Sequence, residues 1–209
     1  MADTSNKTVS RLRLVRNISL GFSVIILIAV VAVVASRQME TPSGGQPEVK
    51  IGGPFTLTDH TGKQVTEADF QGTNTLIFFG YTYCPDICPT SLTEISAAMD
   101  ALGPLAEKVT PVLVTVDPER DTVDVLKDYV AHFHPRVVGL TGTVEQIKQT
   151  AKAYRVYYAK VPSESGNADD YLMDHSSVIY LMGPGGKFLS HFSHQTDGAT
   201  MAAKIKSLL

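Results

Sequence analysis

The stretch T-L-I-F-F-G-Y-T-Y-C-P-D-I-C-P, residues 75–89, joins an uninterrupted apolar run to two cysteines that stand four positions apart. The apolar run at residues 76–79 predicts a strand that is buried on both faces, as in the centre of a parallel sheet. Apolar side chains at helical spacing over residues 89–102 predict that a helix follows. Cys84 and Cys88 therefore lie where a strand passes into a helix, and they are the only cysteines in a chain of 209 residues.

Strands and helices alternate outward from this junction. Further strands are predicted at residues 55–59, 109–116, 136–140, 157–161, 177–182 and 188–192, and further helices at 122–133, 143–154 and 197–209. This order predicts one α/β domain over residues 51–209, with a central mixed sheet flanked by helices. A cysteine pair at the first strand-to-helix junction is typical of the thioredoxin-like class, which is the fold we expect.

An apolar segment precedes this domain. Residues 18–35 carry no charge, and at 18 residues they are long enough for a short membrane-spanning helix. Three arginines precede the segment and one follows it closely, so the positive-inside bias predicts a cytoplasmic tail (1–17), a transmembrane anchor (18–36), a linker (37–50) and an exported domain. A cleaved signal peptide is the alternative, because Val33-Val34-Ala35 offers small residues for cleavage.

The charge of the exported part argues against a nucleic-acid partner. Residues 1–37 hold five of the 18 basic side chains and one of the 21 acidic ones. The remainder therefore has 13 basic side chains against 20 acidic ones, a formal charge of −7. No basic stripe interleaved with aromatic residues offsets this excess of negative charge. We expect no nucleic acid among the partners.

Two thiols so close together in an oxidising compartment have three uses: a structural disulfide, a redox pair or a clamp for a soft metal. A disulfide that closes so small a loop adds little stability, which disfavours the purely structural use. Residues four apart on a helix share a face, so both sulfurs can point to one place. The positive end of the helix favours thiolate, which serves a redox pair and a metal clamp alike. The spacing by itself leaves these two uses open.

A third ligand, most simply an imidazole, would add selectivity for copper. Five of the six histidines have ordinary explanations in turns, at helix ends or on the surface: His60, His132, His134, His191 and His194. His175 differs because it precedes the strand predicted at 177–182, whose beginning abuts the cysteine turn in a thioredoxin-like sheet. Thioredoxins carry a cis-proline in that loop, where it screens the thiols from metal. Here no proline lies between Pro162 and Pro184.

Three strings taken together resemble the Sco/SenC family of membrane-anchored copper chaperones. They are Y-C-P-D-I-C-P at residues 83–89, V-D-P-E-R-D-T at 116–122 and D-H-S at 174–176. The resemblance covers residues 50–209 together with the N-terminal anchor, and no motif position departs from the family pattern. A resemblance over this much of the chain implies both the fold and the chemistry of the site.

The resemblance implies a metallochaperone rather than an enzyme, with Cys84, Cys88 and His175 as ligands of Cu(I) and Cu(II). The copper would pass to the binuclear copper site of cytochrome c oxidase subunit II, and other periplasmic copper chaperones would be further partners. The alternative is a thiol-disulfide reductase that keeps the cysteines of that site reduced, with Cys84 as the attacking thiol. The tail lacks an Arg/Ser-rich transit segment, so we expect a single-pass protein of a bacterial inner membrane, with its domain in the periplasm, rather than a mitochondrial protein.

Five charged residues of these strings are candidates for the surroundings of the metal: Asp86, Asp117, Arg120, Asp121 and Asp174. The first lies between the cysteines, where it either tunes the local charge or solvates the turn. Asp117, Arg120 and Asp121 follow a predicted buried strand. We expect them to form an ion-pair network that braces the site, in preference to capping the next helix. The last either accepts the second imidazole N–H of His175 or lies in a turn.

Overall fold

The computed structural model describes residues 25–34, 50–163, 167 and 170–209. The chain divides into two compact units, Met1–Val49 and Lys50–Leu209. In the first unit, residues 25–34 are helical and their side chains are exposed. The predicted tail, residues 18–24 and 35–36 of the predicted anchor, and the predicted linker up to residue 49 lie outside the described residues. Among the residues that are described, no helix is both long enough and apolar enough to span a membrane.

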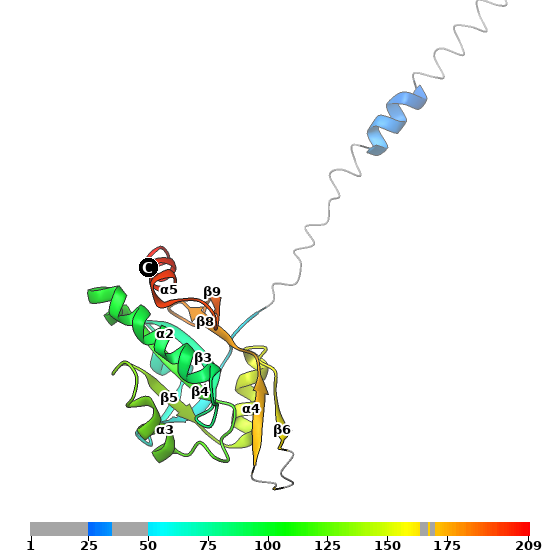
Figure 1. Cartoon of the computed structure of the whole chain (residues 1–209). Helices are drawn as coiled ribbons and strands as arrows, with labels where there is room; N and C mark the ends of the chain where they lie inside the picture. Colours follow the sequence, from blue (N-terminus) through cyan, green and yellow to red (C-terminus); the bar gives the residue numbers. More distant parts are fainter. Residues whose placement is uncertain (1–24, 35–49, 164–166, 168–169) are drawn as a thin grey trace, which may run out of the picture. The chain divides into compact units, whose positions relative to one another are not determined.

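A mixed sheet of seven strands forms the centre of the second unit (Figure 1). In sheet order the strands are β2 (Gln64–Thr66), β1 (Thr56–Asp59), β5 (Val138–Thr141), β4 (Val109–Thr115), β3 (Asn74–Gly80), β8 (Val178–Met182) and β9 (Phe188–Ser193). Strands β3, β4 and β5 run parallel, and the remaining neighbours pair antiparallel. All seven residues of β3 are buried, as its apolar run predicts.

Four α-helices and two short 3-10 helices surround the sheet. They are η1 (Glu67–Phe70), α2 (Ile87–Leu102), η2 (Gly103–Lys108), α3 (Val123–Val130), α4 (Val144–Ala153) and α5 (Gly198–Lys206). Thr122, Thr143 and Asp197 begin α3, α4 and α5 by accepting a hydrogen bond from an N–H three residues further on. Asp86 begins α2 without such a bond, and the N–H of Cys88 in the first turn donates to the Cys84 sulfur instead.

The helices cover both faces of the sheet, which confirms the predicted α/β fold with a central mixed sheet flanked by helices. Gly80 of β3 faces Cys88 of α2, and Gly139 on the same face of β5 lies against α3. Helix α5 packs on α2, so these three helices share one side. Helix α4 lies on the opposite side, where Tyr154 just after its end meets Phe79 of β3 at a ring distance of 5.4 Å.

A second, two-stranded sheet is formed by β6 (Tyr158–Pro162) and β7 (Tyr171–His175), which pair antiparallel with each other. The sequence analysis missed β7 and placed these residues in a loop. The strand is short, and its alternation of buried Tyr171 and Met173 with exposed Leu172 and Asp174 is a weak signal over five residues. As a result His175 stands at the end of a hairpin strand, two residues before β8 begins.

Candidate metal centre

The two cysteines and His175 converge beyond the C-terminal end of β3. Cys84 lies in the loop that follows β3, Cys88 in the first turn of α2 and His175 at the last position of β7. One ligand atom from each residue lies within 4.8 Å of the other two. Ligands that bind one metal ion at about 2.0–2.3 Å stand at comparable distances from one another. The three side chains are thus placed to hold a single ion.

Close contacts link the three side chains directly. The backbone N–H of Cys88 donates a hydrogen bond to the Cys84 sulfur at 3.4 Å. The Cys88 sulfur lies 3.4 Å from Nε2 of His175. Cys84 is half-buried, whereas Cys88 is completely buried, and neither sulfur forms a disulfide. The pair therefore presents one sulfur toward the surface and holds the other beneath it.

The two thiols differ strongly in acidity. Hydrogen bonds to the sulfur lower the pKa of Cys84 to about 3, first from the Cys88 thiol and then from the backbone N–H groups of Asp86 and Cys88. The same contact, together with burial, raises the pKa of Cys88. At neutral pH the centre therefore holds one thiolate and one thiol, and a metal that binds both sulfurs must displace the Cys88 proton.

Gly80 provides the space for the buried sulfur. A Cβ atom at this position would lie 3.0 Å from the Cys88 sulfur and 2.9 Å from the Phe78 ring. Both distances are shorter than a normal contact, so a side chain at residue 80 would force Cys88 or Phe78 to move. The absence of a side chain at the last residue of β3 is thus part of the construction of the site.

The ring of His175 is held by aromatic contacts and by one backbone hydrogen bond. Its edge packs against Phe78 and Tyr81 at ring distances of 6.1 and 5.9 Å. Its Nδ1 lies 3.3 Å from the carbonyl oxygen of Ser176, to which Nδ1–H donates. This leaves the lone pair of Nε2 facing Cys88, which is the tautomer that a metal ligand needs.

Asp174 does not accept the second imidazole N–H of His175, which was one of the two roles considered for it. The carbonyl of Ser176 takes that place, and Asp174 is exposed in β7 opposite Ala159 of β6. The physical reason is the strand itself, because successive side chains of a strand point to opposite faces. Asp174 is a strand residue rather than the turn residue of our alternative.

Asp117 and Arg120 connect the loop after β4 to β7. Asp117 is buried and accepts hydrogen bonds from Nε of Arg120 at 2.5 Å and from the Tyr171 hydroxyl at 2.9 Å. Nη1 of Arg120 donates to the Tyr171 carbonyl at 2.9 Å, and the guanidinium lies 3.7 Å from the centre of the Tyr171 ring. These contacts hold β7 against the main sheet, while Thr122 supplies the cap of α3.

Asp121 ties the cysteine turn to the end of β4. Its buried carboxylate accepts hydrogen bonds from the N–H and hydroxyl of Thr82, at 3.1 and 2.6 Å, and from the hydroxyl of Thr115 at 2.5 Å. Burial raises its pKa. Asp86, in contrast, is exposed beside the site, and its backbone N–H rather than its carboxylate reaches the Cys84 sulfur.

Two of the other histidines have partners away from this site. Nδ1 of His60 accepts a hydrogen bond from the N–H of Gly139 at 3.1 Å, and Nδ1 of His134 accepts one from the N–H of Arg136 at 3.2 Å. Within the described residues, the group at the end of β3 is the one set of three cysteine, histidine or acidic side chains placed to hold a metal.

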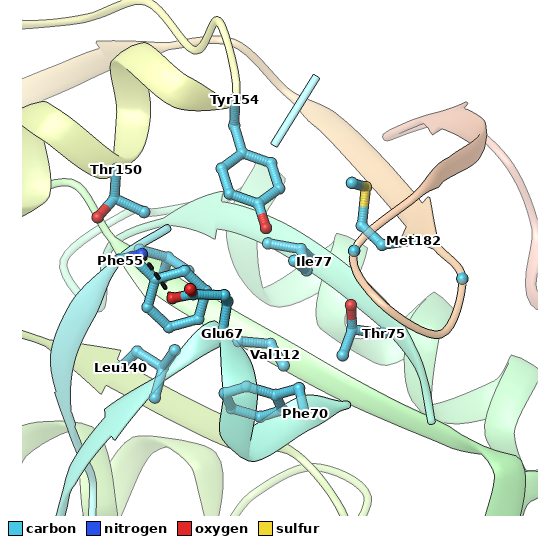
Figure 2. Close-up of a pocket in the computed structure, with 13 residues that line it drawn as sticks. Phe55, Glu67, Phe70, Thr75, Ile77, Val112, Leu140, Thr150, Tyr154 and Met182 are labelled. Atoms are coloured by element: carbon cyan, nitrogen blue, oxygen red, sulfur yellow. Dashed lines mark hydrogen bonds between the residues drawn. The ribbon is translucent and has the colours of Figure 1, made fainter. Parts of the chain in front are cut away.

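An apolar cavity on the α4 side of the sheet is a different site from the metal centre (Figure 2). It has a volume of about 30 Å³ and lies between Phe55, Ile77 and Tyr154. Glu67 at its edge accepts a hydrogen bond from the N–H of Phe55 at 2.9 Å. A single water needs about 10–15 Å³ by the same measure, so this cavity has room for about two waters rather than for a substrate.

Comparison with known proteins decides the family. The family model described as SCO1/SenC matches residues 43–209, which is most of the chain and includes all the residues of the metal centre. The chain belongs to the SCO1/SenC family. A human protein, "Protein SCO1 homolog, mitochondrial", is 43% identical over 157 residues, which cover 74% of this chain and 52% of the relative. The "SCO2-like protein" of Rickettsia felis is 44% identical over 163 residues, covering 75% of this chain and 78% of the relative.

The chain thus spans about half the length of the human relative that it matches. Among solved structures, it is similar to Bradyrhizobium japonicum ScoI, which was solved with copper bound. That structure is 48% identical to this chain, covers 76% of it with 99% of its own residues, and superimposes with a TM-score of 0.70. A family member with the same fold has therefore been seen with copper, a metal that suits two sulfurs and one imidazole nitrogen.

Sequence reasoning missed several residues that shape the centre: Gly80, Thr82, Tyr171 and Ser176. Gly80 and Thr82 lie inside residues 75–89, but nothing in the local sequence shows that Gly80 faces the Cys88 sulfur or that Thr82 donates to the buried carboxylate of Asp121. Tyr171 lies 51 residues from Arg120, whose hydrogen bond it accepts. An alternating pattern over residues 171–175 is the one signal that could have found it.

Proposed function

We propose that this protein is a copper metallochaperone, which holds Cu(I) or Cu(II) through Cys84, Cys88 and His175 and passes it to the binuclear copper site of cytochrome c oxidase subunit II. The observation that carries the proposal is the convergence of two sulfurs and one imidazole nitrogen within 4.8 Å. Copper bound to ScoI, a relative with 48% identity, supports the choice of metal. Thiolate and imidazole are ligands that suit copper in both oxidation states.

The construction of the site suits transfer as well as binding. Three protein ligands leave room in the coordination sphere for a ligand from another protein. Cys84 faces the surface, so an incoming thiolate or imidazole displaces it first, while Cys88 and His175 still hold the ion. The copper can then leave by successive ligand exchange. Return of a proton to Cys88 favours the empty form once the metal has left.

We further propose that residues 18–36 anchor the protein in a bacterial inner membrane by a single span, with the domain of residues 51–209 in the periplasm. The apolar segment and the arginines before it support this orientation. The relative from Rickettsia felis supports a location in a bacterial membrane, whereas the human relative is described as mitochondrial. Other periplasmic copper chaperones would supply the copper.

The ligand set is tested by loading the full chain, purified in detergent, with Cu(I) and with Cu(II). We expect one copper per chain, and loss of tight binding of both ions when Cys84 or Cys88 is replaced by serine. His175→Ala is expected to lose tight Cu(II) binding and to retain weaker Cu(I) binding, since two thiolates suffice for Cu(I). His191→Ala, an exposed histidine on β9, is the matched control. Unchanged tight Cu(II) binding by His175→Ala would contradict the three-ligand site.

A thiol-disulfide reductase is the second candidate, and the unequal thiols favour it. Thiolate Cys84 would attack a partner's disulfide, form a mixed disulfide and release one partner thiol. Cys88 would then attack Cys84, release the second partner thiol and leave a Cys84–Cys88 disulfide. Cells that carry His175→Ala distinguish the two functions. Full oxidase assembly without copper binding would support the reductase, whereas loss of assembly with intact reductase activity would support copper delivery.

A further inference from the structure

The metal centre opens into a surface depression of about 380 Å³. Its walls come from three segments: the cysteine turn, the β6–β7 hairpin and the loop after β7. Cys84 and His175 lie among its lining residues, and Cys88 lies buried beneath them. An incoming ligand therefore approaches the metal through this depression. Because a thiolate or imidazole must come within about 2.0–2.3 Å of the ion, a folded acceptor must rest on the rim while exchange takes place.

The rim of the depression is rich in exposed apolar side chains. Ile87, Val161 and Leu172 line it with exposed fractions of 36%, 47% and 49%, and Tyr83, which directly precedes Cys84, is 68% exposed. These side chains come from the loop after β3, helix α2, strand β6 and strand β7, so their meeting at one place is a result of the fold. Exposed apolar side chains gathered at one place mark interaction sites on soluble domains.

The charged side chains that line the depression, apart from the metal ligands, are acidic. Asp86 and Asp174 are the two charged residues among the lining residues other than the ligands, and no lysine or arginine is found there. Neither carboxylate takes part in an ion pair within the described part of the chain. Complementary charge across an interface speeds encounter and selects the partner.

From these observations we infer that the surface formed by Tyr83, Asp86, Ile87, Val161, Leu172 and Asp174, here called the site rim, is the docking surface for the copper-accepting protein. The partner must present an apolar surface with basic side chains around its own metal ligands. A second copy of this chain is a poor fit, because it would bring carboxylates against carboxylates. The inference rests on the proposed function and adds the chemistry of the partner to it.

The experiment compares transfer of copper to a small molecule with transfer to a protein. The full chain in detergent is loaded with Cu(I) and mixed either with the chelator bicinchoninate or with the purified, metal-free copper domain of cytochrome c oxidase subunit II. The variants are Val161→Ser/Leu172→Ser and Asp86→Asn/Asp174→Asn. Matched controls change equally exposed residues away from the rim: Val125→Ser/Val144→Ser and Glu107→Gln/Asp128→Asn.

We expect all variants to bind one copper and to lose it to bicinchoninate at the wild-type rate. The two rim variants are expected to transfer copper to the protein probe at least ~10-fold more slowly than wild type, while the controls transfer normally. Raising the salt concentration from 50 to 500 mM should slow the wild-type transfer and leave the Asp86→Asn/Asp174→Asn variant nearly unaffected, because rim charges act on the rate of association.

Equal transfer rates for wild type and rim variants would overturn the docking surface and leave the proposed function standing. Copper transfer that becomes faster with salt would contradict a partner with basic side chains. A dimer of the copper-loaded chain in gel filtration that is lost in the rim variants would show that the site rim binds a second copy of this chain instead. Absence of copper binding by the wild type, in contrast, would overturn the proposed function and this inference with it.

Discussion

At the scale of single residues, the centre depends on side chains that are small or absent as much as on its ligands. Gly80 leaves room for the Cys88 sulfur, and the Ser176 hydroxyl accepts a hydrogen bond from the N–H of Tyr157. The Ser176 carbonyl orients the imidazole, so this function needs a backbone atom and no particular side chain. Substitutions that add volume next to the ligands should therefore disturb copper binding even though they remove no ligand.

Gly80→Ala tests the space behind Cys88. The new Cβ would meet the sulfur at 3.0 Å, and overpacking of this kind costs about 1–3 kcal/mol of folding free energy. We expect copper affinity to fall about tenfold, measured by competition with a chelator, and the midpoint of urea unfolding to fall as well. The stability penalty should shrink in a Cys88→Ala background, where the sulfur is gone. An equal penalty in both backgrounds would show that the clash with Cys88 is not the cause.

The lowered pKa of Cys84 predicts an unusual pH dependence of its reactivity. Because the pKa is held near 3, the thiolate is present throughout the range from about pH 5 to 8 and is lost only as the pH falls toward 3. Alkylation of the reduced, metal-free protein by iodoacetamide should proceed at a nearly constant rate over that range, followed by mass spectrometry. An ordinary thiol would slow about tenfold for each unit of pH below its pKa.

Cys88→Ala provides the control, since it removes the hydrogen bond that contributes most to this shift. Alkylation of Cys84 in this variant should slow steeply as the pH is lowered. A rate in the wild type that already falls tenfold per unit between pH 8 and 6 would contradict the thiolate assignment.

At the scale of elements, the β6–β7 hairpin carries the ligand His175, but it does not pair with the strands of the main sheet. Its attachment runs through Arg120, whose guanidinium donates to the buried Asp117 and to the backbone of Tyr171 and also stacks on the Tyr171 ring. The position of His175 relative to the cysteines therefore depends on contacts that lie four residues away along β7.

Arg120→Lys tests this attachment. Lysine keeps the positive charge beside Asp117 but cannot make the forked, stacked contact. We expect the Cu(II) absorption bands to shift and copper to dissociate several-fold faster, while Cu(I) stoichiometry stays at one. Lys160→Met is the control. It removes the second cation that lies over the Tyr171 ring and should leave the Cu(II) spectrum unchanged. A normal Cu(II) spectrum in Arg120→Lys would remove the case for this clamp.

At the scale of the whole molecule, the metal would join the hairpin to the main sheet, because two ligands come from the β3–α2 junction and one from β7. Binding to the folded state alone stabilises it by about 2.7 kcal/mol at a free copper concentration 100 times the Kd. For the unit of residues 50–209 we expect the melting temperature to rise by roughly 5–10 °C on loading with Cu(I), measured by calorimetry.

A strong chelator should return the melting temperature to that of the metal-free protein. The Cys84→Ser/Cys88→Ser variant should show no rise on addition of copper, which controls for binding elsewhere on the chain. A rise of the same size in that variant would mean that the stabilising ion is bound at another site.

The predictions from sequence were most successful where the signal is local. The apolar run of β3, the helix after it and the placement of the two cysteines at their junction all depend on residues close to one another in the chain, although Cys84 lies in the loop before α2 rather than on the helix. The predicted helix over 122–133 ended early, at Val130, and Pro135 helps to explain why, since a proline ring clashes with the helical carbonyl four residues before it, here that of Ala131. The β7 strand was too short, and its alternation over five residues too weak, to be recognised.

By itself, the sequence determined the α/β alternation, the buried central strand and the three side chains that are placed to hold a metal ion, because periodicity and residue chemistry are properties of the chain. Only the tertiary structure decided what surrounds those residues: Ser176 rather than Asp174 as partner of the imidazole, Tyr171 as the partner of Arg120, and the apolar and acidic site rim. These contacts join segments far apart in the chain, and their geometry is set by how β7 packs against the sheet rather than by any local preference of the residues involved.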